Sequence, residues 1–175
     1  MPYPDPAPQS AVPLIVIPCL NEAEHIARVT QQMLAAAARH GGLVVVVDGG
    51  STDGTRAIVA DLAREFDLLR LLDNPARRQA SAVNAAVAAY GQGHTHLIRV
   101  DAHSLYPDDF VDVLLAEALA TRAASVVVGM IAAGEQGLQR LNAETQNARI
   151  GNGGSAHRAR GQGEFVDHGH HALME

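Results

Sequence analysis

The stretch Leu43–Val47 restricts the possible folds more than any other part of this chain. Its five consecutive apolar residues, four of them valine, contain no polar position that could face water. Such a run predicts a strand that is buried on both faces, and strands of this kind occur in parallel sheets covered by helices. The run leads directly into Asp48 and a loop rich in turn formers. The stretch therefore predicts an α/β fold.

Further apolar runs alternate with helical patterns along the chain. Strands are expected at Val12–Ile17, Leu43–Val47, Leu68–Leu72, His96–Val100 and Ser125–Gly129. Helices are expected at Ala23–Arg39, from a cap at Asp53 or Thr55 to Phe66, at Ala76–Tyr90, and at Asp108–Ala120 after Pro107. The alternation predicts a Rossmann-like, mostly parallel sheet with helices on both faces. Because the carboxyl ends of parallel strands share one edge, polar residues there are expected to converge: Asn21, Asp48, Asp53, Asn74 and Asp101.

Composition narrows the class of protein. The 175 residues are 47% hydrophobic and 18% charged, which is typical of one globular domain. A net charge of -6 argues against a nucleic-acid partner. The single Cys19 excludes an intramolecular disulfide and favours the cytoplasm. No apolar run approaches the ~20 residues of a membrane span, and residues 1–11 are expected to be a flexible Pro-rich arm without signal-peptide character.

A strand that stops at Asp101, with His103 two residues later, is the first candidate for chemistry. Side chains alternate along an extended backbone, so both groups point to one side and can hold a divalent cation. The alternative is structural: Asp101 caps a loop and His103 is an ordinary surface histidine. A pattern of only three residues does not distinguish this alternative from a metal site. Both interpretations stay open on the residues alone.

Other polar residues near strand ends have two interpretations each. The loop after Asp48 either makes turns and caps or contacts a nucleotide, and no G-x-G-x-x-G follows the first strand, which weakens an oxidoreductase interpretation. Arg77, Arg78 and Arg99 either approach a diphosphate or lie in solvent. Cys19 is expected to be a small buried apolar residue.

Four stretches occur in an order that resembles the signature of family 2 glycosyltransferases of the GT-A fold. They are Pro18–Glu22, Val47–Thr55, Asn84, and Asp101–His103 followed by Tyr106–Pro107. Within that family, Arg99–His103 and Val166–Ala172 resemble the enzymes of succinoglycan-type exopolysaccharide synthesis. The match covers roughly Val12 to Glu175.

The resemblance implies a GT-A fold, with residues 12–129 as the nucleotide-sugar-binding core and residues 130–175 as a truncated acceptor-side segment of the same domain. It implies nucleotide-sugar contacts at Pro18, Asn21, Glu22, Asp48, Asp53, Asn84 and Asp101. It places a divalent cation, Mn²⁺ or Mg²⁺, on Asp101 and His103. Two departures from the pattern stand out: Gly49 occupies the position of a second acid, and His103 that of an aspartate. The imidazole makes the site softer, which favours Mn²⁺.

The activity implied is metal-dependent, inverting transfer of sugar from a nucleotide-sugar donor to a growing, lipid-linked exopolysaccharide. It would take place in the cytoplasm, with a longer form associated with the inner face of the plasma membrane. The base of the family lies downstream of the segment that matches Asp167–Met174, so this chain is expected to bind nucleotide but to transfer sugar poorly. Asp167 is the one weak candidate for the base within the chain.

Two alternatives remain from the sequence. One is a catalytically incomplete nucleotide-binding module. The other is a phosphatase-like hydrolase, which would need an aspartate after the first strand, where this chain has Pro18–Asn21. The histidine-rich end, His168–His171, is expected to have a structural, acceptor-loop or second metal-binding role. No feature specifies an oligomeric state.

Overall fold

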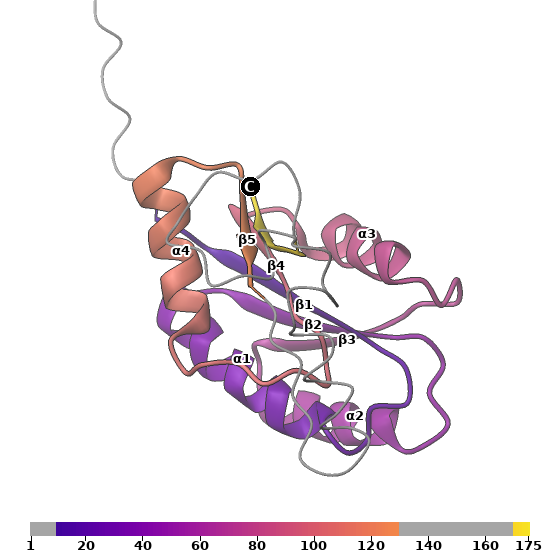
Figure 1. Cartoon of the computed structure of the whole chain (residues 1–175). Coiled ribbons are helices and arrows are strands. Elements are labelled where there is room, and N and C mark those ends of the chain that lie inside the picture. The colour runs from indigo at the N-terminus through magenta and orange to yellow at the C-terminus, as the bar shows by residue number, and fades with distance from the viewer. Residues whose placement is uncertain (1–9, 130–169) are drawn as a thin grey trace, which may run out of the picture. The chain divides into compact units, whose positions relative to one another are not determined.

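The computed structural model describes residues 10–129 and 170–175 (Figure 1). Its strands are β1 (Pro13–Cys19), β2 (Leu43–Asp48), β3 (Leu69–Asp73), β4 (His96–Arg99), β5 (Ser125–Val128) and β6 (His170–Met174). Its helices are α1 (Ile26–His40), α2 (Thr55–Glu65), α3 (Gln79–Tyr90) and α4 (Phe110–Thr121). None of these described helices is long and apolar enough to cross a membrane.

The strands form one sheet in the order β3-β2-β1-β4-β6-β5. β1 pairs in parallel with β2 and β4, and β2 pairs in parallel with β3. This confirms the mostly parallel sheet that the apolar strands predict. β6 pairs antiparallel with β4, through Leu97 with Met174 and Ile98 with Leu173. The sequence analysis did not predict β6, because the polar residues His170 and His171 interrupt the apolar pattern that indicates a strand.

Helices cover both faces of the sheet, as expected. From β1 to β3 the chain steps across the sheet in one direction, and from β3 to β4 it steps back past β1. Since such crossovers are almost always right-handed, the two directions place helices on opposite faces. Accordingly α1 contacts β1, β2 and α2, whereas α3 packs on the other face and α4 lies beside α1 (Figure 1).

The core on the α3 side is built from alternate strand residues and small helix residues. Leu14, Val16, Val45 and Val47 meet Ala82 and Ala86 of α3, and all six are buried. The alanines let the helix approach the sheet closely. The intervening residues of β1 and β2 point to the opposite face, where α1 packs.

Three helices begin later than their sequence patterns predict. α1 starts at Ile26, three residues after the expected Ala23. α3 and α4 also start late. α3 starts at Gln79 because a turn precedes it, in which Arg77 N–H donates to the Asn74 carbonyl and Arg77 takes a left-handed φ of 54°. α4 starts at Phe110, so Pro107 and Asp108 lie before the helix. For α3 and α4 the residues counted as a first helical turn belong to the loop that shapes the site.

α1 and α4 are joined by an ion cluster at Asp112. Its carboxylate accepts hydrogen bonds from Arg39 Nη2 at 2.5 Å and lies 2.6 Å from His40 Nε2. These partners, Arg39 foremost, lower the pKa of Asp112. Gln32 of α1 also donates to the carbonyls of Tyr106 and Pro107, so the loop that follows β4 is held against α1.

Two compact units divide the chain. The first contains residues up to Val126 together with Leu173–Glu175, and the second is Val127–Ala172. All side chains described below belong to the first unit. The sequence also predicts a polar helix at Gln136–Arg149 and a strand at Glu164–Asp167. These two segments, and Asp167 itself, lie outside the described residues. The division into a binding core and an acceptor-side segment stays a prediction.

Candidate functional site

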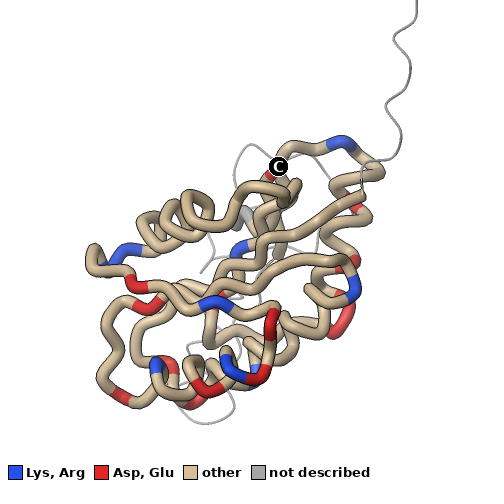
Figure 2. Tube along the Cα trace, turned by 180° about the vertical axis from the view of Figure 1, so that it is seen from behind, with Lys and Arg blue, Asp and Glu red and all other residues tan. Residues whose placement is uncertain are grey.

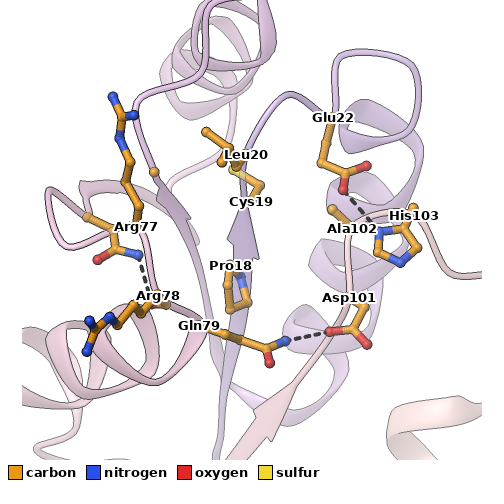
Figure 3. A pocket seen from close by; sticks show the side chains of 12 residues that line it. Pro18, Cys19, Leu20, Glu22, Arg77, Arg78, Gln79, Asp101, Ala102 and His103 are labelled. Carbon is orange, nitrogen blue, oxygen red and sulfur yellow. Dashed lines mark hydrogen bonds and ion pairs between the residues drawn. The ribbon is translucent and has the colours of Figure 1, made fainter.

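A pocket lies where parallel strands β1, β2 and β4 end (Figure 3). The ends of the strands, the loops after β1, β2, β3 and β4, and the start of α3 supply its lining. The lining residues are Pro18, Cys19, Leu20, Glu22, Gly49, Asn74, Arg77, Arg78, Gln79, Asp101, Ala102 and His103. This is the edge at which open α/β sheets bind ligands, and the sequence predicts a site there.

One wall of the pocket is basic and comes from the turn before α3. The buried Asn74 side chain folds this turn, donating to the Arg78 carbonyl at 3.0 Å and accepting from Ser81 Oγ at 2.7 Å. Arg77 and Arg78 are among the residues that line the pocket, although the guanidinium group of Arg78 points away from Asp101 and His103 (Figure 3). Both arginines line the pocket and are also exposed to solvent, so contact of Arg77 and Arg78 with a diphosphate stays a prediction. α3 itself contains no charged residue, so all the acidic and basic positions coloured in Figure 2 lie outside it.

The opposite wall carries the Asp101 carboxylate. Gln79 Nε2 donates to Asp101 Oδ1 at 2.9 Å, and the Asp101 backbone N–H donates to the Tyr106 hydroxyl at 2.8 Å. Burial raises the pKa of Tyr106, whose ring packs against Phe110 with 4.6 Å between centroids. Asp101 is thus held from two sides. Sequence reasoning missed Gln79, because nothing in a single sequence signals a contact between residues 22 positions apart.

His103 stands on the same wall, paired with a glutamate from another loop. Its Nδ1 lies 3.0 Å from Glu22 Oε1 (Figure 3). Glu22 follows β1, so the pair links the loops after β1 and β4. The sequence analysis assigned the two residues to different parts of the site.

The floor contains Cys19, whose thiol lies 3.9 Å from Asp48 Oδ1. Burial, and secondarily the charge of Asp48, raises the pKa of Cys19 to about 12. The prediction that Cys19 is a small buried residue agrees with its 7% exposure.

We expect native Cys19 to resist alkylation between pH 7 and 9. A pKa raised from 9.0 to about 12 keeps the thiol neutral across this window, and only the thiolate reacts. Relative to the chain in concentrated urea, the rate should fall by a factor of at least ~10³. Mass spectrometry after timed iodoacetamide pulses measures both rates. Comparable rates in the folded and unfolded chain would contradict the buried placement.

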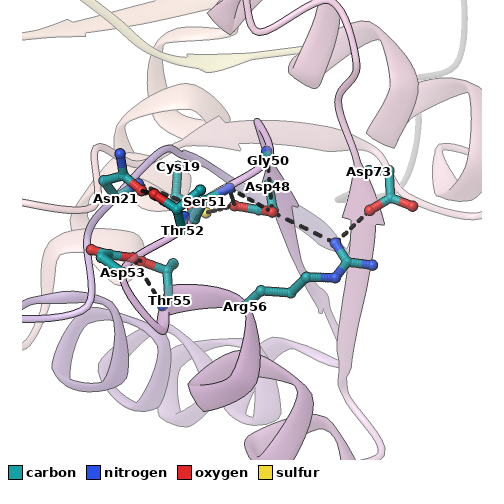
Figure 4. Close-up of polar contacts among 10 residues, drawn as sticks. All are labelled: Cys19, Asn21, Asp48, Gly50, Ser51, Thr52, Asp53, Thr55, Arg56 and Asp73. Atoms are coloured by element: carbon teal, nitrogen blue, oxygen red, sulfur yellow. Dashed lines mark hydrogen bonds and ion pairs between the residues drawn. The ribbon is translucent and has the colours of Figure 1, made fainter.

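The loops after β1 and β2 are locked together beside the pocket (Figure 4). Asn21, in a left-handed φ of 56°, donates its N–H to Ser51 Oγ at 2.8 Å and accepts from Thr52 N–H at 2.8 Å. Asp53 Oδ2 accepts from Ala23 N–H at 3.0 Å. A hydrogen bond from the Thr55 hydroxyl lowers the pKa of Asp53. These two sequence motifs therefore brace one another.

Asp48, at the end of β2, holds the loop that follows this strand. It is 1% exposed, and its oxygens accept from the N–H groups of Gly50 and Ser51 and from the Ser51 hydroxyl. Arg56 Nη1 lies 3.6 Å away and also pairs with Asp73 (Figure 4). The carboxylate thus shapes the loop, and its neighbour Gly49 lines the pocket.

The residues predicted for the site fall into three groups. Pro18, Glu22, Asp101 and His103 line the pocket. Asn21, Asp48 and Asp53 lie in the adjacent locked loops and not in the lining. Asn84 is exposed on α3 and does not line the pocket. Direct contact of a nucleotide or cation with residues of any of the three groups stays a prediction.

The pocket fits a divalent cation of the kind that phosphate ligands help to hold. Among described residues, no group of three or more histidine, cysteine or acidic side chains is placed to bind a metal by itself. Asp101 and His103 offer one carboxylate and one imidazole. Mg²⁺ and similar ions are commonly held by one or two side chains together with substrate phosphates, so these donors suit a cation that arrives with a diphosphate.

The mostly parallel sheet with a pocket at its carboxyl edge agrees with the GT-A fold, and solved structures with this fold match the chain. A *Staphylococcus aureus* TarS fragment matches with a TM-score of 0.60 at 17% identity, covering 72% of this chain and 37% of that one. The mannosyltransferase PcManGT from *Pyrobaculum calidifontis*, solved with GDP-Man and Mn²⁺, matches with a TM-score of 0.53 at 27% identity, covering 84% and 44%.

The family follows from the sequence comparisons. The model described as glycosyl transferase family 2 matches residues 14–175. The chain is 51% identical over 161 residues to the succinoglycan biosynthesis protein ExoA of *Rhizobium meliloti* (strain 1021). It therefore belongs to family 2 of the glycosyltransferases. It covers 49% of that relative, and 92% of its own residues take part in the match.

Proposed function

We propose that this chain binds a nucleotide-sugar donor with a divalent cation and transfers the sugar, with inversion, to a growing exopolysaccharide. The observation that carries the proposal is the pocket with Arg77 and Arg78 on one wall and Asp101 and His103 on the other. The similarity to a succinoglycan biosynthesis protein supports the glycan acceptor. A lipid-linked acceptor would place the reaction at the cytoplasmic face of the membrane.

The two walls of the pocket have different roles in binding a nucleoside diphosphate: one binds the phosphates and the other holds the cation. The guanidinium groups of Arg77 and Arg78 bind phosphate oxygens directly, since their forked donors match that geometry. Asp101 and His103 would hold the cation, for which Mn²⁺ suits a mixed carboxylate and imidazole site better than Mg²⁺ does. When bound, the cation offsets the negative charge that develops on the leaving diphosphate.

The locked loops give the nucleoside its place. Asn21, Asp48 and Asp53 hold the loops after β1 and β2 in one arrangement, and Pro18 and Gly49 line the pocket beside these loops. We include all of these, with Glu22 and Asn84, in the nucleotide-sugar site. In the transfer step, the acceptor hydroxyl oxygen attacks the anomeric carbon, the bond to the diphosphate breaks, and the hydroxyl proton passes to a base.

A second candidate function is nucleotide binding without transfer. It is favoured by the state of the two described pocket carboxylates, since Glu22 is paired with His103 and Asp101 with Gln79. Neither is poised to take a proton from an acceptor. In this case Asp167, the weak candidate for the base, would have no catalytic role.

A thermal-shift screen tests the binding part of the proposal. UDP, GDP and other nucleoside diphosphates are compared with and without Mn²⁺ or Mg²⁺, because a ligand that binds only the folded state raises its stability. Stabilisation that needs both nucleotide and cation supports the site. No shift with any pair overturns it. A transfer assay with nucleotide sugars and lipid-linked acceptors then separates the two candidates, since binding without turnover leaves only the second.

A further inference from the structure

We propose that Glu22 is a positioning residue for His103, holding the imidazole with its proton on Nδ1 so that Nε2 is the atom offered to the cation. This inference rests on the proposed function. It gives Glu22 a role different from the contact with base and ribose that the family resemblance implies. The starting observation is the 3.0 Å separation between His103 Nδ1 and Glu22 Oε1.

Glu22 is the anchored partner of this pair. Its backbone N–H donates to Thr55 Oγ1 at 2.8 Å, and its carbonyl accepts from the N–H groups of His25 and Ile26 at the start of α1. Its side chain is 18% exposed, whereas that of His103 is 66% exposed. A well-held carboxylate therefore restrains an imidazole that would otherwise rotate in solvent.

The chemistry of the pair determines the tautomer. An ionised carboxylate only accepts hydrogen bonds, so the ring nitrogen facing Glu22 must carry the proton. In the neutral ring the lone pair is then on Nε2, which lies on the other side of the ring from Glu22 (Figure 3). Histidines that bind metals commonly donate their second N–H to a carboxylate, which orients the ring and makes it a stronger ligand.

Asp101 has an equivalent support from a different segment. Gln79 at the start of α3 donates to Asp101 Oδ1, just as Glu22 after β1 accepts from His103. Each predicted cation ligand is thus contacted by a side chain from a different segment of the chain. This pattern is expected where ligand geometry must be set before the cation and the diphosphate arrive.

The test is a double-mutant cycle read by Mn²⁺ affinity. Free Mn²⁺ is followed by electron paramagnetic resonance in titrations, each run with and without UDP, of the whole chain and of Glu22→Ala, His103→Ala and the double variant. We expect Glu22→Ala to weaken Mn²⁺ binding by ~10-fold or more, as for other outer partners of metal ligands. In the His103→Ala background the same substitution should have no further effect. Glu22→Gln, whose amide oxygen can still accept from Nδ1–H, should recover part of the loss.

Two controls separate positioning from general effects. Glu24→Gln makes the same charge change two residues away on an exposed side chain, and it should leave Mn²⁺ affinity unchanged. Long-range ¹H–¹⁵N spectra at about pH 8, where an ordinary histidine is neutral, report the His103 tautomer without metal. We expect the Nδ1–H form in the parent chain and loss of that preference in Glu22→Ala.

Equal losses from Glu22→Ala with and without His103 would overturn the inference, because Glu22 would then act independently. So would an unchanged tautomer. These two results would contradict only the role of Glu22, and they can be distinguished from results that contradict the proposed function. If Mn²⁺ affinity depends on Asp101 but not on the pair, only the inference falls, and if the chain binds no Mn²⁺ with or without a nucleoside diphosphate, both fall.

Discussion

Asp101→Asn is expected to weaken Mn²⁺-supported binding of a nucleoside diphosphate by about 100-fold, or about 2.8 kcal/mol. The substitution keeps the shape of the side chain and an oxygen that can accept from Gln79, so the pocket should stay assembled. It removes the negative charge that holds the cation against the phosphates. The loss should therefore be confined to titrations that contain Mn²⁺.

Calorimetric titrations of UDP and GDP, with Mn²⁺ and with a chelator, measure this effect. Asp109→Asn is the matched control, since Asp109 is exposed before α4, makes no side-chain cap and does not line the pocket. It should bind as the parent chain does. Parent-like affinity in a folded Asp101→Asn variant would remove Asp101 from the set of ligands.

Asp48→Ala is expected to lower the free energy of unfolding by about 3 kcal/mol, because it removes a buried carboxylate that several partly buried donors share. The N–H groups of Gly50 and Ser51 and the Ser51 hydroxyl all lose their acceptor. At 1% exposure of Asp48, water replaces it poorly. Since these bonds hold the loop that carries Gly49 into the pocket, nucleotide affinity should fall as well.

Asp73→Ala provides the comparison for Asp48. Both carboxylates pair with Arg56, but the Asp73 side chain is 73% exposed. Exposed ion pairs contribute about 0–1 kcal/mol, so this variant should unfold close to the parent chain. Denaturant unfolding of the two variants makes the measurement. Similar losses in both would mean that the Arg56 ion pair, and not the buried loop acceptor, is what Asp48 supplies.

The elements of the fold were predictable because they depend on local patterns. Leu43–Val47 has no polar face, and the strand found there differs from the prediction only by including Asp48. The start of α3 was less predictable. Ala76–Arg78 have helix-forming side chains, yet the turn closed by the buried Asn74 and the left-handed Arg77 delays the helix to Gln79. The side-chain pattern of a short segment cannot show that tertiary hydrogen bonds stabilise a turn in place of the first helical turn.

The sequence by itself determined the order of layers, the edge at which the site lies, and the family, because uniformly apolar strands and ordered motifs are properties of neighbouring residues. Only the tertiary structure decided how the motif residues are used. In the folded chain, Asn21 and Asp48 make the hydrogen bonds that hold the loops after β1 and β2. Arg77 lines the pocket, and Glu22 pairs with His103, 81 positions away. The physical reason is that a carboxylate or amide bonds to whatever donor the folded backbone places within about 3 Å of it, and that distance exists only after the strands have aligned.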